Sequence, residues 1–393
     1  MATTEPGRSP ARRRLLAIVL GVCGFLAVDC HAQTFAVLHS FEGGTDGITP
    51  YAGVVRDPDG NLYGMTYTGG ATNHWGVLYK ISSAGQETVL HTMTGHSGGN
   101  SFASLYIDSA GNLYGTASGG GPTRGGTVFE LKKSGGQLFV LHSFRVNGLP
   151  DALDADSSLI SDPEGNLYGS SMTGGDYGVG AVYSLNPKTG AEALIYSFTG
   201  GSDGAFPSGG KLVRDSAGNL YSATSSGGAA GYGAVYKLDM SGAETVLYSF
   251  QNVDDGRSPN GRLAIDEEGN LYGTAALGGT RGDGTIFKID PVGNETTLHT
   301  FVGNDGQFPI DGVVRDSAGN VYGTANEGGS SGAGVVFKLD SGDTFSVLHN
   351  FSGPDGAGPY AAPIGDGKGN LYGTTTGGGT SPCGCGVVYK LVL

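Results

Sequence analysis

Hydrophobic residues in this chain fall in short runs that glycine and aspartate interrupt. Residues 211–250 show the pattern best, with runs over 211–214, 219–224, 233–238 and 244–250. Runs of this length, rich in Val, Tyr and Thr and bounded by turn-forming residues, predict four short β-strands, named A to D in chain order. After residue 32 no window keeps the 3.6-residue apolar period of a helix, so the pattern predicts an all-β domain.

The four-strand pattern repeats along the chain. Asn-Leu-Tyr-Gly, or a close variant, follows a glycine and precedes a Gly-Gly pair by eight residues in every copy, and the copies are spaced by 51, 54, 53, 51, 50 and 50 residues. Seven copies of four strands predict a seven-bladed β-propeller with four-stranded antiparallel blades. The copies start at Asn61, Asn112, Asn166, Asn219, Asn270, Asn320 and Asn370.

The two ends of the repeat region each hold part of a blade. Residues 35–41 read as a D strand with no A, B or C before it, and residues 386–391 read as a C strand with no D after it. We expect the N-terminal strand to complete the last blade, because this pairing removes two open sheet edges and closes the ring.

The repeated motif resembles a known family. Asp-Ser-Ala-Gly-Asn-Leu-Tyr-Gly-Thr, followed by Gly-Gly and Val-Phe-Lys-Leu, is similar to the GloVer (Gloeo-Verruco) tandem repeat of exported bacterial proteins, and the similarity covers residues 35–393. The resemblance implies an exported β-propeller repeat protein, and it carries no established reaction or ligand. Gly-Asn-Leu-Tyr is more distantly similar to the turn and strand of NHL and lactonase-type propellers.

Composition narrows the function. The chain has 75 Gly and 16 Pro but also 19 Tyr and 16 Phe, which supply a core, and its formal charge is −14. An acidic protein without clustered Lys and Arg is a poor partner for nucleic acid or an anionic membrane. We therefore expect neither partner.

Residues 1–32 have the pattern of a signal peptide. Arginines at the start precede an uncharged, mostly apolar stretch over 15–28, and Ala32 offers a cleavage site before Gln33. A lipoprotein anchor at Cys23 or Cys30 is the alternative. We expect a propeller domain over 33–393 that is secreted, periplasmic or held at the cell surface, with no membrane segment after cleavage.

One face of the propeller carries the varied loops. Antiparallel order places the B–C and D–A loops together, and these loops differ between copies, whereas the A–B and C–D turns are short and alike. We expect any ligand on the varied face, where Trp75 and Arg281 lie. An Asp-Gly-x-x-Pro element also recurs there, and it suits either turn formation or a ring of carboxylates near the pore mouth that binds Ca²⁺ or a hydroxyl-rich ligand. Its aspartates are Asp46, Asp203, Asp255, Asp305 and Asp355.

Repeated aromatic and histidine positions are interpreted as packing. Each copy has the motif tyrosine, for which we expect a hydrogen-bond partner, and strand D has His or Tyr at one shared position. These histidines cannot share one metal ion, because each belongs to a different blade. Strand D carries His39, His91, His142, His299 and His349, with Tyr196 and Tyr248 in the remaining copies. Cys383 and Cys385 flank one glycine in the last B–C loop, and we expect a local disulfide in an exported protein.

No catalytic motif with its required context is present. Gly-x-Ser-x-Gly occurs around Ser97, Ser202 and Ser330, but no helix follows as a nucleophile elbow requires. An enzyme would instead need repeat-breaking polar residues to meet at the pore. The candidates are Arg145, Asp154, Asp156, Arg257 and Arg262.

The favoured function is a monomeric binding or surface-interaction scaffold, with carbohydrate or another exported macromolecule as ligand. A lactonase-like hydrolase or a lyase at the pore mouth is the alternative, since propellers host both. A purely structural surface protein is the third.

Overall fold

The computed structural model describes residue 1 and residues 33–71, 74–134, 136–146, 151–207 and 211–393. Residues 33–393 form one compact unit. The signal-peptide prediction falls on residues 2–32, outside the described residues, and stays a prediction.

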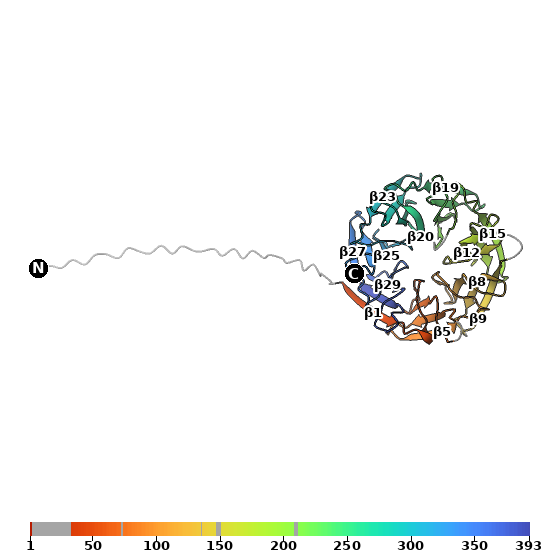
Figure 1. Ribbon diagram of the computed structural model, residues 1–393, viewed down its shortest axis with the longest axis horizontal. Helices are drawn as coiled ribbons and strands as arrows, with labels where there is room; N and C mark the ends of the chain where they lie inside the picture. Colours follow the sequence, from red (N-terminus) through yellow and green to blue (C-terminus); the bar gives the residue numbers. More distant parts are fainter. Residues whose placement is uncertain (2–32, 72–73, 135, 147–150, 208–210) are drawn as a thin grey trace. The chain divides into compact units, whose positions relative to one another are not determined.

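This unit is a seven-bladed β-propeller (Figure 1). In the described residues, the strands form seven four-stranded antiparallel sheets in the order A–B–C–D, so the predicted fold class is confirmed. The D strands β1, β5, β9, β15, β19, β23 and β27 lie around the periphery in Figure 1, which leaves the A strands nearest the centre.

Blades 1 to 4 are made of consecutive strands. Blade 1 has β2 (Val55–Arg56), β3 (Leu62–Met65), β4 (Val77–Ile81) and β5 (Glu87–Thr92), and blade 2 has β6 (Tyr106–Ile107), β7 (Leu113–Ala117), β8 (Arg124–Leu131) and β9 (Leu138–Arg145). Blade 3 has β11 (Ile160–Ser161), β12 (Leu167–Ser171), β14 (Ala181–Asn186) and β15 (Ala191–Ser197), and blade 4 has β16 (Val213–Arg214), β17 (Leu220–Thr224), β18 (Ala234–Leu238) and β19 (Glu244–Ser249).

Blades 5 to 7 complete the ring. Blade 5 has β20 (Arg257–Ile265), β21 (Leu271–Leu277), β22 (Thr285–Ile289) and β23 (Glu295–Thr300), and blade 6 has β24 (Val313–Arg315), β25 (Val321–Ala325), β26 (Val335–Leu339) and β27 (Phe345–Asn350). Blade 7 has β28 (Ile364–Gly365), β29 (Asn370–Thr375), β30 (Val387–Val392) and β1 (Thr34–Ser40). A 3₁₀ turn, η1 (Gly44–Asp46), and a small pair, β10 (Ala152–Leu153) with β13 (Thr173–Gly174), lie in the loops.

The N-terminal strand closes the ring. β1 pairs antiparallel with β30, from Thr34 opposite Val392 to Ser40 opposite Val387. The ring of Phe35 also stacks on His349 of blade 6, with 3.8 Å between centroids. The strand therefore joins the last blade to the first residues of the domain, as predicted.

The repeated motif is explained by the A–B hairpin. Asp57 accepts hydrogen bonds from the Asn61 backbone N–H and amide, both at 2.8 Å, and from the Tyr63 hydroxyl at 3.0 Å. The expected partner of the repeated tyrosine is thus the first residue of its own hairpin. Burial opposes the shift, but these hydrogen bonds together lower the pKa of Asp57.

The motif glycine makes room for an aromatic ring of strand C. A Cβ at Gly323 would overlap the ring of Phe337, and a Cβ at Gly64 would overlap the Tyr79 hydroxyl. The Phe337 ring in turn contacts Phe301 of the neighbouring blade edge-on, at 5.4 Å between centroids. In every blade but the fourth, which has Ser222 at this position, the glycine therefore makes room for a fully buried aromatic residue between blades.

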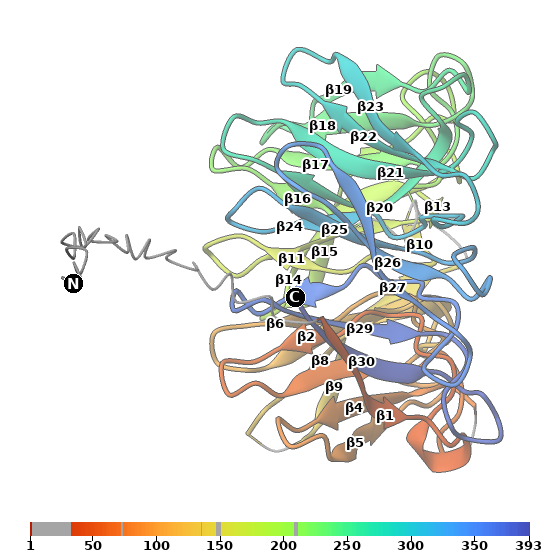
Figure 2. The same ribbon diagram turned by 90° about the vertical axis from the view of Figure 1, so that its left-hand side faces the viewer.

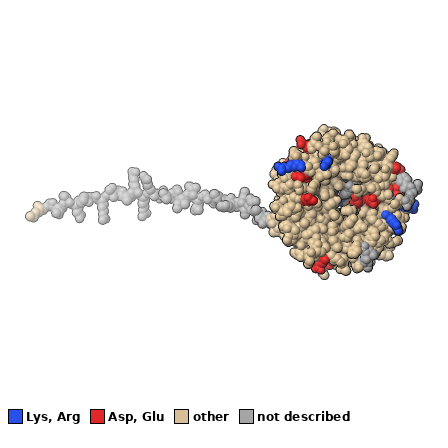
Figure 3. All heavy atoms as spheres, in the orientation of Figure 1, with Lys and Arg blue, Asp and Glu red and all other residues tan. Residues whose placement is uncertain are grey.

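Loops and turns divide between two faces. Figure 2 shows the short A–B and C–D hairpins on one side and the longer loops with β10 and β13 on the other. On the face seen in Figure 3, charged side chains are few and scattered, so the acidic excess makes no continuous patch there. Within the described part of the chain, no helix has the length and apolar character needed to span a membrane.

Candidate binding site in the central pore

Because the A strands are the innermost strands, the residues just before them, and Arg262 within β20, lie toward the axis of the ring. They lie four to six positions ahead of the hairpin aspartate of their copy, and these positions differ from blade to blade. Blades 7, 1 and 2 contribute aromatic residues, whereas blades 3 to 6 contribute charged ones. The two halves of the pore therefore differ in chemistry.

The aromatic half is a cluster of four partly buried rings. Tyr51 lies with its centroid 5.1 Å from Phe102, 5.1 Å from Tyr360 and 5.3 Å from Tyr67. Tyr67 and Phe102 are 4.7 Å apart. Because three consecutive blades supply these rings, the cluster joins blades 7, 1 and 2 through aromatic contacts.

The charged half contains Lys211, Arg262 and Asp311. Lys211 and Arg262 line a cavity of about 350 Å³ formed by the A strands of blades 3 to 6. Asp311 accepts a hydrogen bond from the Ala362 N–H at 3.0 Å. Burial raises the pKa of Asp311 to about 7, against the attraction of Arg262 and Lys211.

Burial and neighbouring charges change the pKa values of the two cations as well. Burial, with Arg262 nearby, lowers the pKa of Lys211 to about 8, although Asp311 acts in the opposite direction. Burial also lowers the pKa of Arg262, again against Asp311. The three groups therefore interact electrostatically although they come from three blades.

An irregular strand brings Arg262 to this place. β20 spans nine residues, and its pairing with β21 shifts between Asn260 and Ala264. The Arg262 N–H donates to the Asp311 carbonyl at 3.0 Å. Gly261 and Gly312, with φ of 79° and 71°, permit this approach, because a Cβ on either one would overlap the backbone of the neighbouring blade.

Tyr360 connects the two halves of the pore. Burial, together with the charges of Asp311 and Asp156, raises the pKa of its hydroxyl. Asp156 is itself buried. Of the five repeat-breaking candidates, Asp156 and Arg262 thus belong to the pore, whereas Arg145, Asp154 and Arg257 are exposed elsewhere.

The predicted aspartate ring lies at the rim, not at the pore mouth. Each carboxylate accepts a backbone N–H from its own loop at 2.7–2.8 Å and contacts the His or Tyr of an outermost D strand at 2.9–3.5 Å. The pore-mouth placement was wrong because the D–A loop starts at the outer strand, which holds its aspartate. The residues are Asp46, Asp203, Asp255, Asp305 and Asp355, and Ser97 and Asp151 take the same place in the other two loops. Calcium binding stays a prediction, and turn formation already accounts for the repeat.

The other two predicted ligand residues lie apart from the pore cluster. Trp75 is partly buried in a hydrophobic cluster with residues of blades 1 and 2, and its ring faces the backbone of Gly95 and Gly120. Arg281 is exposed in the B–C loop of blade 5. The seven predicted residues therefore do not converge on one site.

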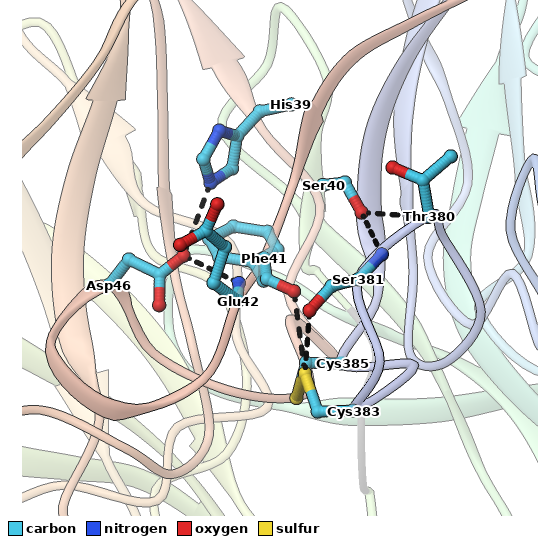
Figure 4. Close-up of a disulfide and its surroundings, with 9 residues drawn as sticks. All are labelled: His39, Ser40, Phe41, Glu42, Asp46, Thr380, Ser381, Cys383 and Cys385. Atoms are coloured by element: carbon cyan, nitrogen blue, oxygen red, sulfur yellow. Dashed lines mark hydrogen bonds and ion pairs between the residues drawn. A yellow bond between two sulfur atoms is a disulfide. The ribbon is translucent and has the colours of Figure 1, made fainter.

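Cys383 and Cys385 form a disulfide in the last B–C loop, with 5.2 Å between Cα atoms (Figure 4). The loop also contacts the end of β1. The Ser40 hydroxyl accepts the Thr380 N–H at 3.0 Å, and the Cys383 sulfur lies 3.5 Å from the Phe41 carbonyl. The stapled loop thus holds the closing strand.

Sequence reasoning missed Lys211, Asp311 and the four aromatic residues. It placed ligands on the varied loops, where Ser40, Glu42 and residues 380–382 line a cavity of about 430 Å³, whereas the cavities of about 690 and 520 Å³ are lined mainly by A–B hairpin residues on the other face. A usable signal was present. Apart from Tyr67, which follows strand B, these side chains stand four to six residues before the hairpin aspartate, where most other copies have Gly, Ala or Ser.

Solved structures of similar fold are propellers of several kinds. Streptogramin B lyase has a TM-score of 0.61 at 12% identity, with 91% of this chain and 97% of that chain covered. An oligogalacturonate lyase in complex with manganese has a TM-score of 0.58 at 13%, with 91% and 93% covered. The extracellular domain of a putative hybrid two-component system from B. thetaiotaomicron has a TM-score of 0.56 at 14% identity, with 91% of this chain and 41% of that chain covered.

Curated proteins give no match to this sequence. The family model described as the Gloeobacter/Verrucomicrobia repeat matches residues 25–211 and 154–389. These two matches overlap and span nearly the whole propeller, so the chain belongs to the Gloeobacter/Verrucomicrobia repeat family.

Proposed function

We propose that this protein is an exported binding protein that takes a carbohydrate with acidic groups into its central pore. The observation that carries the proposal is the pairing of an aromatic cluster (Tyr51, Tyr67, Phe102 and Tyr360) with a charged group (Lys211, Arg262 and Asp311), of which Lys211 and Arg262 line a cavity of about 350 Å³. Aromatic rings suit the apolar faces of sugar rings, and buried cations suit carboxylates.

Export rests on the signal-peptide pattern of residues 1–32 and on the family resemblance. The fold comparison with the extracellular domain from B. thetaiotaomicron agrees with a location outside the cytoplasm. We expect the exported protein to act as a monomer.

The charge states predict how affinity for an anionic ligand depends on pH. Lys211, with a pKa of about 8, loses its positive charge as the pH rises. Asp311, with a pKa of about 7, loses its negative charge as the pH falls. Both changes act in the same direction, so affinity should increase when the pH is lowered from 9 to 6.

The test is calorimetric titration with a galacturonate oligosaccharide and with a neutral oligosaccharide of equal length. We expect binding of the acidic probe, loss of at least about tenfold in affinity for Lys211→Gln and Arg262→Gln, and a similar loss for Tyr51→Ala. Arg281→Gln changes a cation outside the pore and should bind as wild type. Binding that depends on Arg281 and not on Arg262 would place the ligand on the loops and refute the proposal.

A pore enzyme, either a hydrolase or a lyase, is the second candidate. It is favoured by the electrostatic coupling of Lys211 and Asp311 across two blades, since burial brings the pKa values of both groups toward neutrality, as acid–base catalysts require. Incubation of the same oligosaccharides with the protein distinguishes the two functions. Shortened products that Lys211→Gln fails to form would establish the enzyme, and intact sugar that is bound and released would establish the binding protein.

A further inference from the structure

The rim of the propeller repeats a contact between neighbouring blades. In each contact, the His or Tyr of one D strand lies beside the acceptor side chain, Asp or Ser, of the D–A loop that follows it. A third residue comes from the next D strand, four positions before the His or Tyr of that strand, and faces both. This third residue is Phe in two contacts, Leu in one and Glu in four, namely Phe35, Phe345, Leu138, Glu87, Glu192, Glu244 and Glu295. The chemistry of the contact changes with it.

With phenylalanine as the third residue, the contact is complete. His299 lies 3.0 Å from Asp305 through Nε2 and stacks on Phe345 at 3.7 Å between centroids. His349 repeats this with Asp355 at 2.9 Å and Phe35 at 3.8 Å. Each carboxylate there faces the N–H of an imidazole.

Between blades 2 and 3 the third residue is Glu192, and the contact is different. His142 Nε2 and Asp151 Oδ1 are 3.9 Å apart. One ligand atom each of His142, Asp151 and Glu192 lies within 4.8 Å of the others. His142 Nε2, Asp151 Oδ1 and Glu192 Oε1 are all buried and have no hydrogen-bond partner.

A second contact fixes the orientation of the imidazole. His142 Nδ1 lies 3.3 Å from the Gly190 carbonyl, which can only accept, so Nδ1 carries the proton in the neutral ring. Nε2 then presents its lone pair to the two carboxylates. A histidine that donates one ring N–H to a carbonyl while the other nitrogen faces acidic oxygens has the arrangement of a metal ligand.

Three acceptors that face one another repel unless a proton or a cation lies between them. One nitrogen and two carboxylate oxygens suit Zn²⁺ or a similar transition metal, whereas Ca²⁺ prefers six or more oxygen ligands.

We propose that His142, Asp151 and Glu192 bind one divalent transition-metal ion, tested first as Zn²⁺, that ties the outer strands of blades 2 and 3 together. The side chains need to close in slightly, because the ligand atoms of a zinc site lie about 2.0–2.2 Å from the metal. Water would fill the remaining position. This site is at the rim and does not depend on the proposed function of the pore.

The chain supplies a matched variant. Tyr196 and Tyr248 replace histidine in two rim contacts where the third residue is Glu244 or Glu295, and their hydroxyls donate to Asp203 and Asp255 at 3.1 and 3.0 Å. His142→Tyr copies this natural arrangement. It should fold normally and lose the metal.

The experiment uses the full chain without a histidine tag, freed of metal by a chelator and titrated with Zn²⁺ by calorimetry. We expect one equivalent bound and a higher melting temperature with Zn²⁺ than with Ca²⁺. His142→Tyr should abolish this binding, and Glu192→Gln should weaken it at least about tenfold. His349→Tyr alters a rim contact without a third carboxylate and should bind as wild type. Bound Co²⁺ should give an intense visible spectrum that His142→Tyr lacks.

Two results would overturn the proposal. If the chelated wild-type protein takes up no Zn²⁺, the three residues share a proton and form no metal site. If His142→Tyr and Glu192→Gln both bind Zn²⁺ like wild type, the ion occupies another position. If His142→Tyr melts well below wild type in chelator, the substitution destabilises the fold itself. The Zn²⁺ affinity of Glu192→Gln and the Co²⁺ spectrum of the wild-type protein then decide whether the metal site exists.

Discussion

At the scale of single residues, the hairpin aspartates organise the repeat. Asp215 accepts the Asn219 backbone N–H at 2.8 Å, the Asn219 amide at 2.7 Å and the Tyr221 hydroxyl at 3.0 Å. Burial acts to raise the pKa of Asp215, yet these hydrogen bonds lower it. The pKa of the corresponding hairpin aspartate is also lowered in blades 1, 3, 5, 6 and 7. The motif therefore stabilises the fold to an extent that depends on ionised carboxylates.

We expect Asp215→Asn to lower the free energy of unfolding at pH 7 by about 1 kcal/mol, since a charged acceptor of three hydrogen bonds is lost at a partly exposed site. The folded pKa lies below the unfolded value of about 3.9, so the contribution is complete above that pH and disappears as the pH falls through the folded pKa. Urea unfolding from pH 7 downward measures the gap. A difference in unfolding free energy that is the same at all pH values would contradict the role of the ionised carboxylate. Asp59→Asn is the control, because Asp59 also lies in an A–B hairpin but does not accept these hydrogen bonds.

At the scale of strands, the motif glycine and the strand C aromatic residue form one unit. The Phe337 ring occupies the place of a Gly323 side chain, and blade 4 shows the exception, with Ser222 beside Tyr236. A methyl group at the glycine pushes the ring toward the neighbouring blade, because the core there is closely packed.

Gly323→Ala is accordingly expected to cost about 1–3 kcal/mol by overpacking. Ser222→Gly removes a side chain where one is already accommodated and should cost less. Chemical unfolding of the two variants gives the comparison. Equal destabilisation would show that chain flexibility, and not the contact with the ring, explains the glycine.

At the scale of the whole molecule, sequence predicted what every copy repeats and missed what depends on the ring. Strand positions, hairpins and closure follow from contacts within a copy, which is why residues 35–41 could be assigned to the last blade, where β1 lies. The pore cluster follows from the radius of the closed ring, because Lys211, Arg262 and Asp311 stand in three different copies. The aspartates failed as a pore site for the same reason, since a loop motif does not reveal its distance from the axis.

Removing residues 33–42 should open the ring and lower the melting temperature by roughly 10 °C or more, because β1 and its stacked aromatic contacts are lost. Calorimetry of the truncated chain measures this. A synthetic peptide of residues 33–42 should restore part of the loss by binding to β30. Identical melting of the truncated and intact proteins would mean that β30 needs no partner.

The pairing of β1 with β30 also sets an order of events in time. The partner of β1 is made last, since Val387 follows Ser40 by almost the whole domain. At about 5–20 residues per second, synthesis separates the two strands by roughly 20–70 s. During that interval the first strand has no partner, so the ring can close only after β30 has been made.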